Sequence, residues 1–151
     1  MRVVAQRVSH AAVVVDGATV GEIENGICAF VGVTHTDTRE DAVAAASKLA
    51  NLRIMPDDDD VMNRSLLDVG GAVLVVSQFT LYGDVRRGRR PSWTSAAGGD
   101  VAEPLVDAVC EELRGLGLEV AEGRFGAMME VTLTNAGPVT IVFEVSSGRV
   151  V

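Results

Sequence analysis

The chain has 151 residues, with 13 basic and 21 acidic side chains that give a formal net charge of −8. This length suits one domain with its own core, and a content of 48% hydrophobic and 23% charged residues excludes a disordered chain. No apolar stretch approaches the roughly 18 residues that a membrane span requires, and the first ten residues do not resemble a secretory signal. We therefore expect a single domain over residues 1–151 in the cytoplasm.

The two cysteines and two histidines offer little chemistry. Cys28 lies in an apolar segment and Cys110 in a helical one, far apart in sequence, so we expect unreactive core thiols in a reducing compartment. A zinc site needs about four close ligands, which these residues do not supply. His10 and His35 would have to serve any Ser-His-Asp triad, but no G-x-S-x-G motif is present. We expect no metal, no cofactor and no conventional triad.

The first third of the chain is predicted to form β-strands. Residues 2–8 alternate polar and apolar side chains, and residues 11–15 and 20–23 flank Asp16-Gly17, a dipeptide typical of tight hairpins. The continuous apolar run 27–33 predicts a strand that is buried on both faces.

A helix is expected to begin near Thr38, because Asp41 stands in capping-box spacing to it. The buried face predicted for this helix consists of Val43, Ala46, Leu49 and Ala50. The acidic run 57–60 follows Pro56 and lacks the spacing of an EF-hand, so an exposed turn is expected there.

The second half predicts a short buried strand over residues 72–76 that leads directly into Ser77–Leu81. A second helix is expected from Asp100, with Pro104 in its first turn, to the stop signals at Gly115 and Gly117. Two final strands, 129–134 and 139–145, flank Asn135-Ala136-Gly137-Pro138. The pattern predicts an α+β single domain with a curved or barrel-like, mostly antiparallel sheet and two main helices.

Main-chain groups and a basic cluster remain as candidates for function. Ser77-Gln78-Phe79-Thr80 ends a buried strand, where oriented N–H groups can stabilise an oxyanion without a titrating side chain. Gly137-Pro138 offers carbonyl oxygens with few competing donors, because proline has no N–H. Arg86, Arg87, Arg89 and Arg90 form a basic cluster on an acidic chain, which suits a partner that contacts one place; the alternative is a solvated loop.

Six segments of the sequence resemble the D-aminoacyl-tRNA deacylase family. They are QRV at 6–8, NLRI at 51–54, SQFTLYGD at 77–84, GRRPS at 88–92, GRFGAMM at 123–129 and NAGPVT at 135–140. The Ser-Gln-x-Thr and Asn-x-Gly-Pro-x-Thr segments are specific to that family when they occur together. The matches run in order along the chain to about residue 145.

The resemblance implies a cytosolic, homodimeric editing hydrolase that cleaves D-amino acids from mischarged tRNA. The catalytic segment that it implies is Ser77, Gln78, Phe79 and Thr80, with the Phe79 and Thr80 N–H groups near the ester carbonyl. It implies a cis Gly137–Pro138 bond that enters the other subunit's active site. The implied substrate-binding residues are Gly137, Pro138, Asn135, Thr140, Arg7, Phe125, Gly126, Ala127, Met128 and Met129, with Arg7 orienting the Gly-Pro motif and 125–129 lining the terminal adenosine pocket. The implied tRNA contacts are Arg86, Arg87, Arg89 and Arg90.

This arrangement predicts selection by chirality. Two carbonyl oxygens on one side of a cis peptide can bind an α-ammonium group, and an L-side chain would then collide with them. We expect many D-amino acids to be accepted and glycyl-tRNA to be cleaved to some degree. Since nothing adjacent supplies the base that a Thr80 nucleophile needs, we expect backbone oxyanion stabilisation with help from the tRNA 2′-hydroxyl.

Two other classes of function remain open from the sequence alone. A non-enzymatic RNA-binding module could use the arginine cluster, although four Phe, one Trp and one Tyr provide few stacking platforms. A small-molecule-binding β-barrel would leave residues 86–90 unexplained. Neither predicts chirality-dependent hydrolysis. The expected partners are tRNA charged with a D-amino acid or glycine and a second copy of the chain, with no DNA and no membrane.

Overall fold

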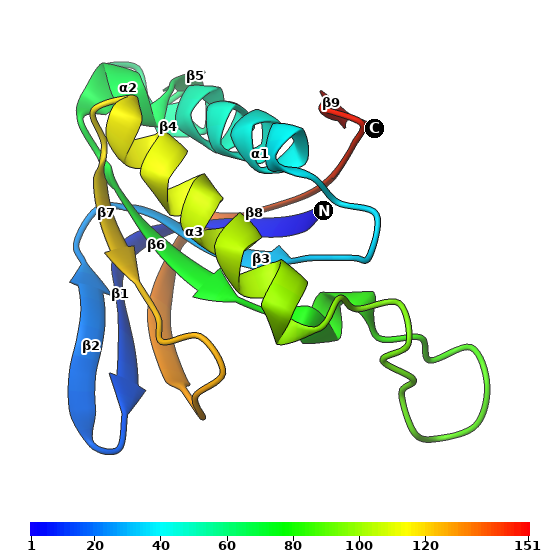
Figure 1. Ribbon diagram of the computed structural model, residues 1–151. Helices are drawn as coiled ribbons and strands as arrows, with labels where there is room; N and C mark the ends of the chain where they lie inside the picture. The colour runs from blue at the N-terminus through cyan, green and yellow to red at the C-terminus, as the bar shows by residue number, and fades with distance from the viewer.

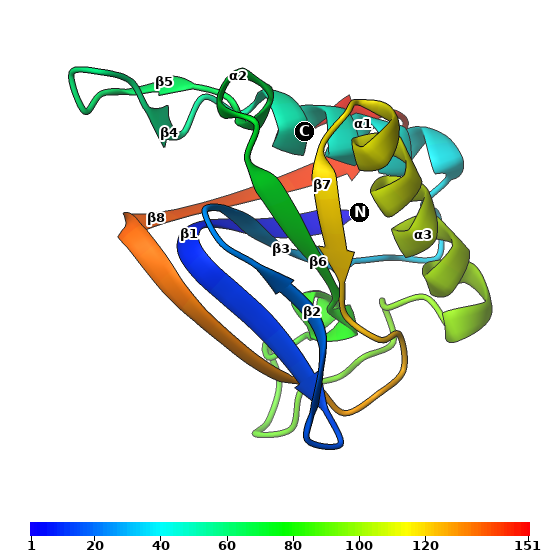
Figure 2. The ribbon, with the colours of Figure 1, turned by 90° about the vertical axis from the view of Figure 1, so that its left-hand side faces the viewer.

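One long N-terminal strand organises the sheet of this protein. In the computed structural model, which describes residues 1–151, β1 (Arg2–Val15) alternates buried and partly exposed residues along nearly its whole length. It pairs antiparallel with β2 (Ala18–Ile23), β3 (Gly26–Gly32) and β8 (Glu130–Ser146). The sheet curves strongly around this strand (Figure 1, Figure 2).

The other edge of the sheet is parallel. β6 (Ala72–Ser77) pairs parallel with β3, and β7 (Glu119–Glu122) pairs parallel with β6, so the order is β7-β6-β3-β1-β8-β9. The last strand, β9 (Arg149–Val150), is antiparallel to β8. β4 (Met55–Pro56) and β5 (Met62–Arg64) form a separate small hairpin.

Helices cover one face of the sheet. α1 (Arg39–Asn51) and α3 (Gly99–Gly115) pack side by side on it, and α2 (Leu66–Val69) is a single turn before β6 (Figure 1, Figure 2). The larger core cluster lies between these helices and the sheet, and a smaller one fills the opposite face, where the sheet curls over itself. The predicted α+β class with a curved, mostly antiparallel sheet is confirmed, with the single-turn α2 added to the two expected main helices.

Several boundaries differ from the sequence-based prediction. β1 is one strand where two were expected, since Ser9 and His10 continue its extended backbone and His10 pairs with Thr134. β8 is also one strand, and its segment 136–139 bulges opposite Arg7 between two paired stretches. The short strands β4, β5, β7 and β9 were not predicted, because two to four residues carry no readable periodicity.

The two main helices begin differently. At α1 the expected capping box is present: the Thr38 N–H donates to Asp41 Oδ2 at 2.8 Å. Val43, which was predicted to be buried, is 37% exposed, and Ala42 and Ala45 take its place in the core. Asp100 does not cap α3; Gly98 does, in an extended conformation, so Pro104 lies beyond the first turn.

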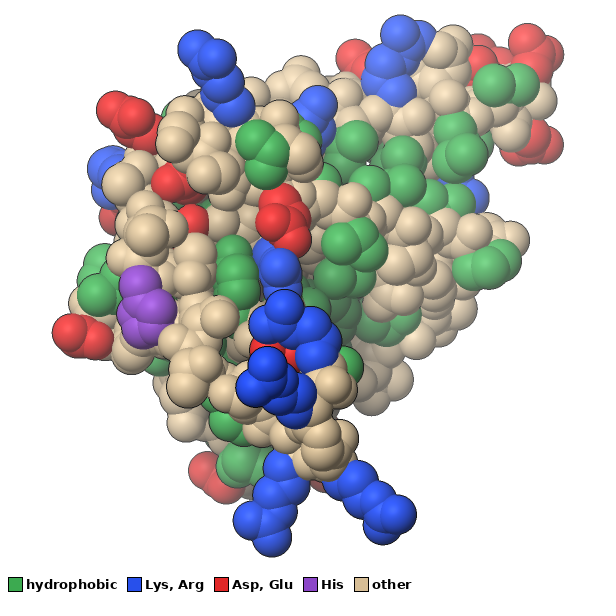
Figure 3. Space-filling view, turned by 90° about the vertical axis from the view of Figure 1, so that its right-hand side faces the viewer, with side chains coloured by type: hydrophobic (Ala, Val, Ile, Leu, Met, Phe, Trp, Pro, Cys, Tyr) green, Lys and Arg blue, Asp and Glu red, His purple; other side chains and the backbone are tan.

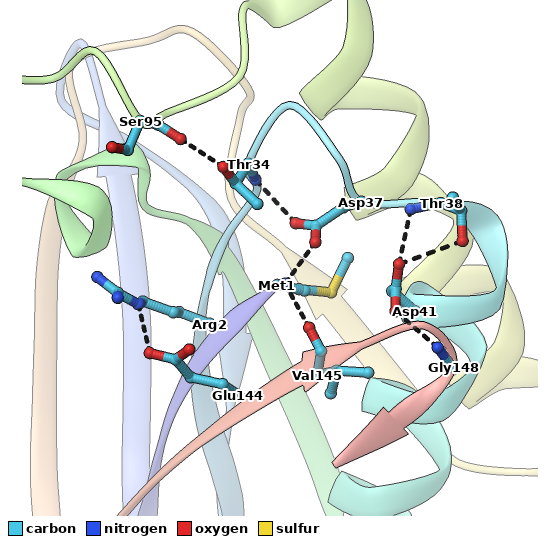
Figure 4. A network of polar contacts seen from close by, with 10 residues as sticks. All are labelled: Met1, Arg2, Thr34, Asp37, Thr38, Asp41, Ser95, Glu144, Val145 and Gly148. Atoms are coloured by element: carbon cyan, nitrogen blue, oxygen red, sulfur yellow. Dashed lines mark hydrogen bonds and ion pairs between the residues drawn. The ribbon is translucent and has the colours of Figure 1, made fainter. Parts of the chain in front are cut away.

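A buried ionic network joins the chain's first residue to the segment before α1 and to β8 (Figure 4). The Met1 ammonium lies 2.5 Å from Asp37 Oδ1 and donates to the Val145 carbonyl at 2.7 Å. Asp37 also accepts the Thr34 N–H, so each charge has several partners. A second buried carboxylate, Asp41, accepts the Gly148 N–H at 2.8 Å. These bonds fix the β8–β9 turn against the start of α1.

Other expectations concern exposure. Asp58–Asp60 form the exposed turn between β4 and β5, as predicted for the acidic run. Cys28 and Cys110 are free and buried, and burial raises the pKa of each thiol to about 12. None of the helices has the length and apolarity that crossing a bilayer requires.

Candidate active site

The chain turns sharply where β6 ends. The Gln78 N–H donates to the Val31 carbonyl at 2.8 Å, which extends the β3–β6 ladder by one bond. The next residues form the 3₁₀ helix η1 (Phe79–Tyr82). Because Phe79 and Thr80 are its first two residues, their main-chain N–H groups have no acceptor within that helix. The strand end therefore presents two N–H donors beside Ser77 and Gln78.

A cavity of about 460 Å³ opens at this strand end. Ser77, Gln78 and Phe79 form one part of its wall, and the segment Phe125–Met129 forms another. Its remaining lining is apolar and comes from β3, β6, α3, β8 and the segment before α3. The structure therefore brings together two segments that are 45 or more residues apart in sequence and that were both singled out as site residues.

The Thr80 hydroxyl accepts a hydrogen bond from the side chain two residues before it. Gln78 Nε2 donates to Thr80 Oγ1. A glutamine amide cannot accept a proton as a base, and neither histidine lines the cavity. His10 Nε2 lies 2.7 Å from Glu22 Oε1, and His35 Nε2 lies 2.9 Å from the Thr94 carbonyl. Thr80 follows the lining residues Ser77–Phe79 but does not itself line the cavity, and its hydroxyl has no base beside it.

The Gly137-Pro138 motif lies in the bulge of β8. Its peptide bond is cis, both residues are exposed, and Gly137 has a φ of +133°. Arg7 Nε donates to the preceding Ala136 carbonyl at 3.0 Å, while Arg7 Nη1 donates to the Ile54 carbonyl at 2.7 Å. A Cβ atom on residue 137 would lie 2.9 Å from Arg7 Nη2, so glycine permits this close approach.

Asn135 and Thr140 close the base of the bulge. Asn135 Oδ1 accepts the Val139 N–H at 3.0 Å, and Asn135 Nδ2 donates to Thr140 Oγ1 at 3.0 Å. Gln6 Nε2 donates to the same hydroxyl. These hydrogen bonds hold the base of the bulge together, and Gly137 and Pro138 are exposed within it.

The motif and the cavity lie apart within one chain. Gly137 and Pro138 do not line the cavity. Arg7 pairs with Ile27, and Ile27 with Val73, so the bulge stands level with a point four residues before Ser77. At about 3.3 Å per residue this is roughly 13 Å along the strands, with three strand spacings of about 4.8 Å across.

The arginine loop, residues 84–92, projects from η1 and is closed by the backbone pairing of Asp84 with Ser92. Arg86 is not free: its guanidinium bonds Asp84 through Nη2 at 2.6 Å and Nε at 2.9 Å. These hydrogen bonds lower the pKa of Asp84 to about 2 and raise that of Arg86. Arg87, Arg89 and Arg90 are exposed and form no ion pair.

Basic side chains gather on the face of the molecule from which this loop projects, with hydrophobic side chains directly beside them (Figure 3). The loop follows η1 in the chain, and Phe79 of η1 also lines the cavity. A ligand that reached from the cavity across η1 would therefore meet this basic surface next.

Sequence reasoning missed most of the apolar wall. The residues concerned are Val31, Val33, Val76, Ala97, Gly99, Ala102, Val106 and Val131. Six of them fall in predicted strands or helices, Ala97 and Gly99 fall just before a predicted helix, and none carries a polar signal that marks it as part of a site.

Comparison with known proteins places this geometry in a family. The family model described as D-Tyr-tRNA(Tyr) deacylase matches residues 4–144. A D-aminoacyl-tRNA deacylase from Streptomyces coelicolor is 58% identical over 96% of this chain and 100% of its own length. One from Thermobifida fusca is 60% identical over 96% and 100%, and one from a Geobacillus species is 56% identical over 95% of each chain.

Solved structures agree in fold. The c-Myc DNA unwinding element binding protein superposes with a TM-score of 0.90 at 35% identity, over 97% of this chain and 100% of its own. A probable eukaryotic D-amino acid tRNA deacylase gives a TM-score of 0.82 at 20% identity, over 95% and 98%. The chain therefore belongs to the D-Tyr-tRNA(Tyr) deacylase family, and the prediction of an enzyme of this family is confirmed.

Proposed function

We propose that this protein hydrolyses the ester bond of D-aminoacyl-tRNA and releases the free D-amino acid and the tRNA. The observation that carries the proposal is the convergence of Ser77–Phe79 and Phe125–Met129 on one cavity of about 460 Å³. Relatives that are 56–60% identical over almost the whole chain are named D-aminoacyl-tRNA deacylases. The cavity has the size of a small-ligand site, and we assign its Phe125–Met129 wall to the terminal adenosine.

A second copy of the chain completes the proposed site. The exposed residues Gly137 and Pro138 do not line the cavity of their own protomer, so the motif of a partner enters it in this proposal. A two-fold homodimer exchanges such motifs reciprocally. The sheet face beside the bulge supports such contact, because Val142 of β8 is 67% exposed next to its strand partner Val4.

The partner's motif supplies the selection by chirality. The Gly137 and Pro138 carbonyl oxygens accept hydrogen bonds from the substrate's α-ammonium, and Arg7 holds the preceding Ala136 carbonyl in place. With the ammonium and the ester carbonyl both fixed, an L-side chain points at the motif and collides, whereas a D-side chain points away. Glycine has no side chain to collide, so glycyl-tRNA is a substrate as well.

The main chain carries the chemistry in this proposal. The Phe79 and Thr80 N–H groups stabilise the oxyanion that forms when water attacks the ester carbonyl. Thr80 does not act as a nucleophile, since its only close polar neighbour is the Gln78 amide and no base adjoins it. The substrate's own ribose 2′-hydroxyl assists the attacking water, so an ester of 2′-deoxyadenosine is a poor substrate.

Arg87, Arg89 and Arg90 bind phosphates of the acceptor stem, and Arg86 shapes the loop through Asp84. Buried free thiols are compatible with a reducing compartment, and we place the reaction in the cytoplasm.

The activity is tested by deacylation of matched D- and L-tyrosyl-tRNA and of glycyl-tRNA by the purified protein. We expect release from the D-ester and the glycyl ester and none from the L-ester above the spontaneous rate. Equal rates on the D- and L-esters, or no hydrolysis of either, would refute the proposed activity. Resistance of glycyl-tRNA alone would refute the steric mechanism of selection.

The shared site is tested by subunit complementation. Gly137→Ala damages the motif, where φ is +133°, and Phe125→Ala damages the cavity wall. Each variant alone is expected to be nearly inactive, but mixed dimers formed by co-refolding contain one intact site, and about a quarter of the wild-type activity returns at a one-to-one ratio. If the motif serves its own protomer, mixing restores nothing.

A further inference from the structure

Phe79 and Trp93 form an exposed aromatic pair at the edge of the cavity. Their ring centroids lie 5.4 Å apart with an interplanar angle of 75°, an edge-to-face arrangement. Phe79 is 55% and Trp93 41% exposed. Folding normally buries most of the large apolar area of such rings, so two neighbouring rings left half in water indicate a contact surface.

The backbone fixes Trp93 in this position. One side of its indole packs on Gly83, where an added Cβ atom would lie 2.6 Å from Trp93 Cζ3. Ser92, the preceding residue, pairs with Asp84 and closes the arginine loop, and the Ala96 N–H donates to the Trp93 carbonyl at 3.0 Å. Trp93 is thus a preorganised ring whose free surface faces solvent.

Three features follow one another from the cavity outward. Phe79 belongs to the cavity wall, Trp93 contacts Phe79, and the unpaired Arg87, Arg89 and Arg90 lie on the arginine loop that immediately precedes Trp93. A stacking ring beside a positively charged path is the arrangement that proteins use for single-stranded nucleic acid. The stacking is tolerant of base identity, because every base has a π-face.

We propose that Trp93, braced by Phe79, stacks on the base of the nucleotide that precedes the terminal adenosine. The inference rests on the proposed function, which puts that adenosine in the cavity. Trp93 is then a positioning residue: it holds the unpaired 3′ end in line while the arginine loop contacts the phosphates beyond. It adds nothing to the discrimination between D- and L-esters, which belongs to the other end of the substrate.

The first test compares two small substrates, the 3′-D-tyrosyl esters of adenosine and of cytidylyl-(3′→5′)-adenosine. Wild-type protein is expected to cleave the dinucleotide ester with a kcat/KM about 5- to 150-fold higher, the range that one base–aromatic stack supplies, mainly through a lower KM. Trp93→Ala removes that advantage and leaves the adenosine ester within about twofold of wild type, whereas Trp93→Phe keeps most of the advantage.

The second test uses the protein's own fluorescence, because Trp93 is its only tryptophan. Cytidylyl-adenosine is expected to quench this emission, while adenosine and a dinucleotide with an abasic 5′ residue leave it nearly unchanged. This readout needs no catalysis, so it separates base stacking from any change in rate.

The outcomes separate the two proposals. If neither ester is cleaved, the proposed function fails, and the fluorescence titration still decides whether a base stacks on Trp93. If both esters are cleaved equally by wild type, or if Trp93→Ala keeps the dinucleotide advantage, the stacking role is wrong. A parallel loss on both esters in Trp93→Ala assigns the ring a purely structural role and also overturns the inference.

Discussion

Arg7 Nε donates to the Ala136 carbonyl oxygen at 3.0 Å and so ties the middle of β1 to the residue before Gly137. The same guanidinium donates from Nη1 to the Ile54 carbonyl at 2.7 Å, which joins the bulge of β8 to the segment after α1. One side chain thus binds two main-chain carbonyls at once. This requires the planar guanidinium group of arginine, which has several N–H donors in fixed directions.

Replacing Arg7 with lysine is therefore expected to impair deacylation without unfolding the protein. A lysine ammonium cannot reach both carbonyls in the same geometry, and the bulge loses its support. We expect kcat/KM for D-tyrosyl-tRNA to fall about 10- to 100-fold, the worth of one or two hydrogen bonds to a charged donor. Arg53→Lys is the matched control, since Arg53 also donates to a main-chain carbonyl, that of Asn63 at 2.6 Å. Equal losses in both variants would contradict a specific role for Arg7.

Thr80→Ala tests whether the main chain carries the reaction. The substitution removes the hydroxyl but keeps the Thr80 N–H, so single-turnover hydrolysis is expected to stay within about tenfold of wild type. Removing a true nucleophile costs on the order of 10⁶-fold in a serine protease. Thr80→Ser serves as the control, because it restores the acceptor for Gln78 Nε2. A loss of several orders of magnitude in Thr80→Ala alone would refute the main-chain mechanism and revive covalent catalysis by Thr80.

Arg87→Ala tests the role of the arginine loop. Because Arg87 is exposed and unpaired, its removal is expected to weaken tRNA binding and to reduce the slope of log Kd against log salt by about 1. Hydrolysis of the adenosine ester, which lacks the acceptor stem, stays unchanged. Arg39→Ala is the control, since Arg39 is exposed on α1 and pairs with Glu111. If the slope of log Kd against log salt is unchanged in Arg87→Ala, Arg87 does not contact the tRNA and the proposed role of the loop is wrong.

The carboxyl group of Asp41 is expected to make the free energy of unfolding depend on pH in the acidic range. Burial alone would raise the pKa of its carboxyl, but hydrogen bonds from Gly148 and Thr38 outweigh burial and lower it from the ordinary 3.8. A depressed folded pKa adds stability that is fully present above pH 3.8 and is lost as the pH falls through the folded value. Asp41→Asn is expected to lower the free energy of unfolding at pH 7 and to flatten its decline below pH 4, measured by urea titration. The same steep decline in both proteins would exclude this carboxyl as the cause.

Features that depend on neighbouring residues were predicted well from the sequence. The way distant segments come together at the cavity was predicted poorly. Thr38 and Asp41 form their capping box because both partners are three residues apart and need no other part of the chain. The site depends on the fold as a whole: Phe125 and Phe79 line one cavity because α3 returns the chain and β7 pairs with β6. The residues alone identified Ser77–Thr80 as a strand end. Residues 125–129, which form the other part of the cavity wall, were predicted only from the resemblance to a family.

The apolar lining of the cavity and the continuity of β8 could not be predicted, because neither produces a recognisable pattern in the sequence. Val31 and Ala102 line the cavity with the same side chains that fill a core, and their exposure to a ligand depends on the gap between α3 and the sheet. The continuity of β8 through Asn135–Val139 was missed because Gly-Pro normally ends a strand, whereas here Arg7 and Asn135 satisfy the bulged backbone.

The pairing of β1 with β8 also determines when the sheet can close during folding. Arg2 pairs with Glu144, so the central strand of the sheet completes its pairing only through residues that are 142 positions apart in sequence. Contacts of such large sequence separation slow folding and leave β1 with one unpaired edge until β8 docks on it. The Gly137-Pro138 bulge lies on that same strand, so the motif proposed to act in a partner subunit takes its shape only when the sheet closes.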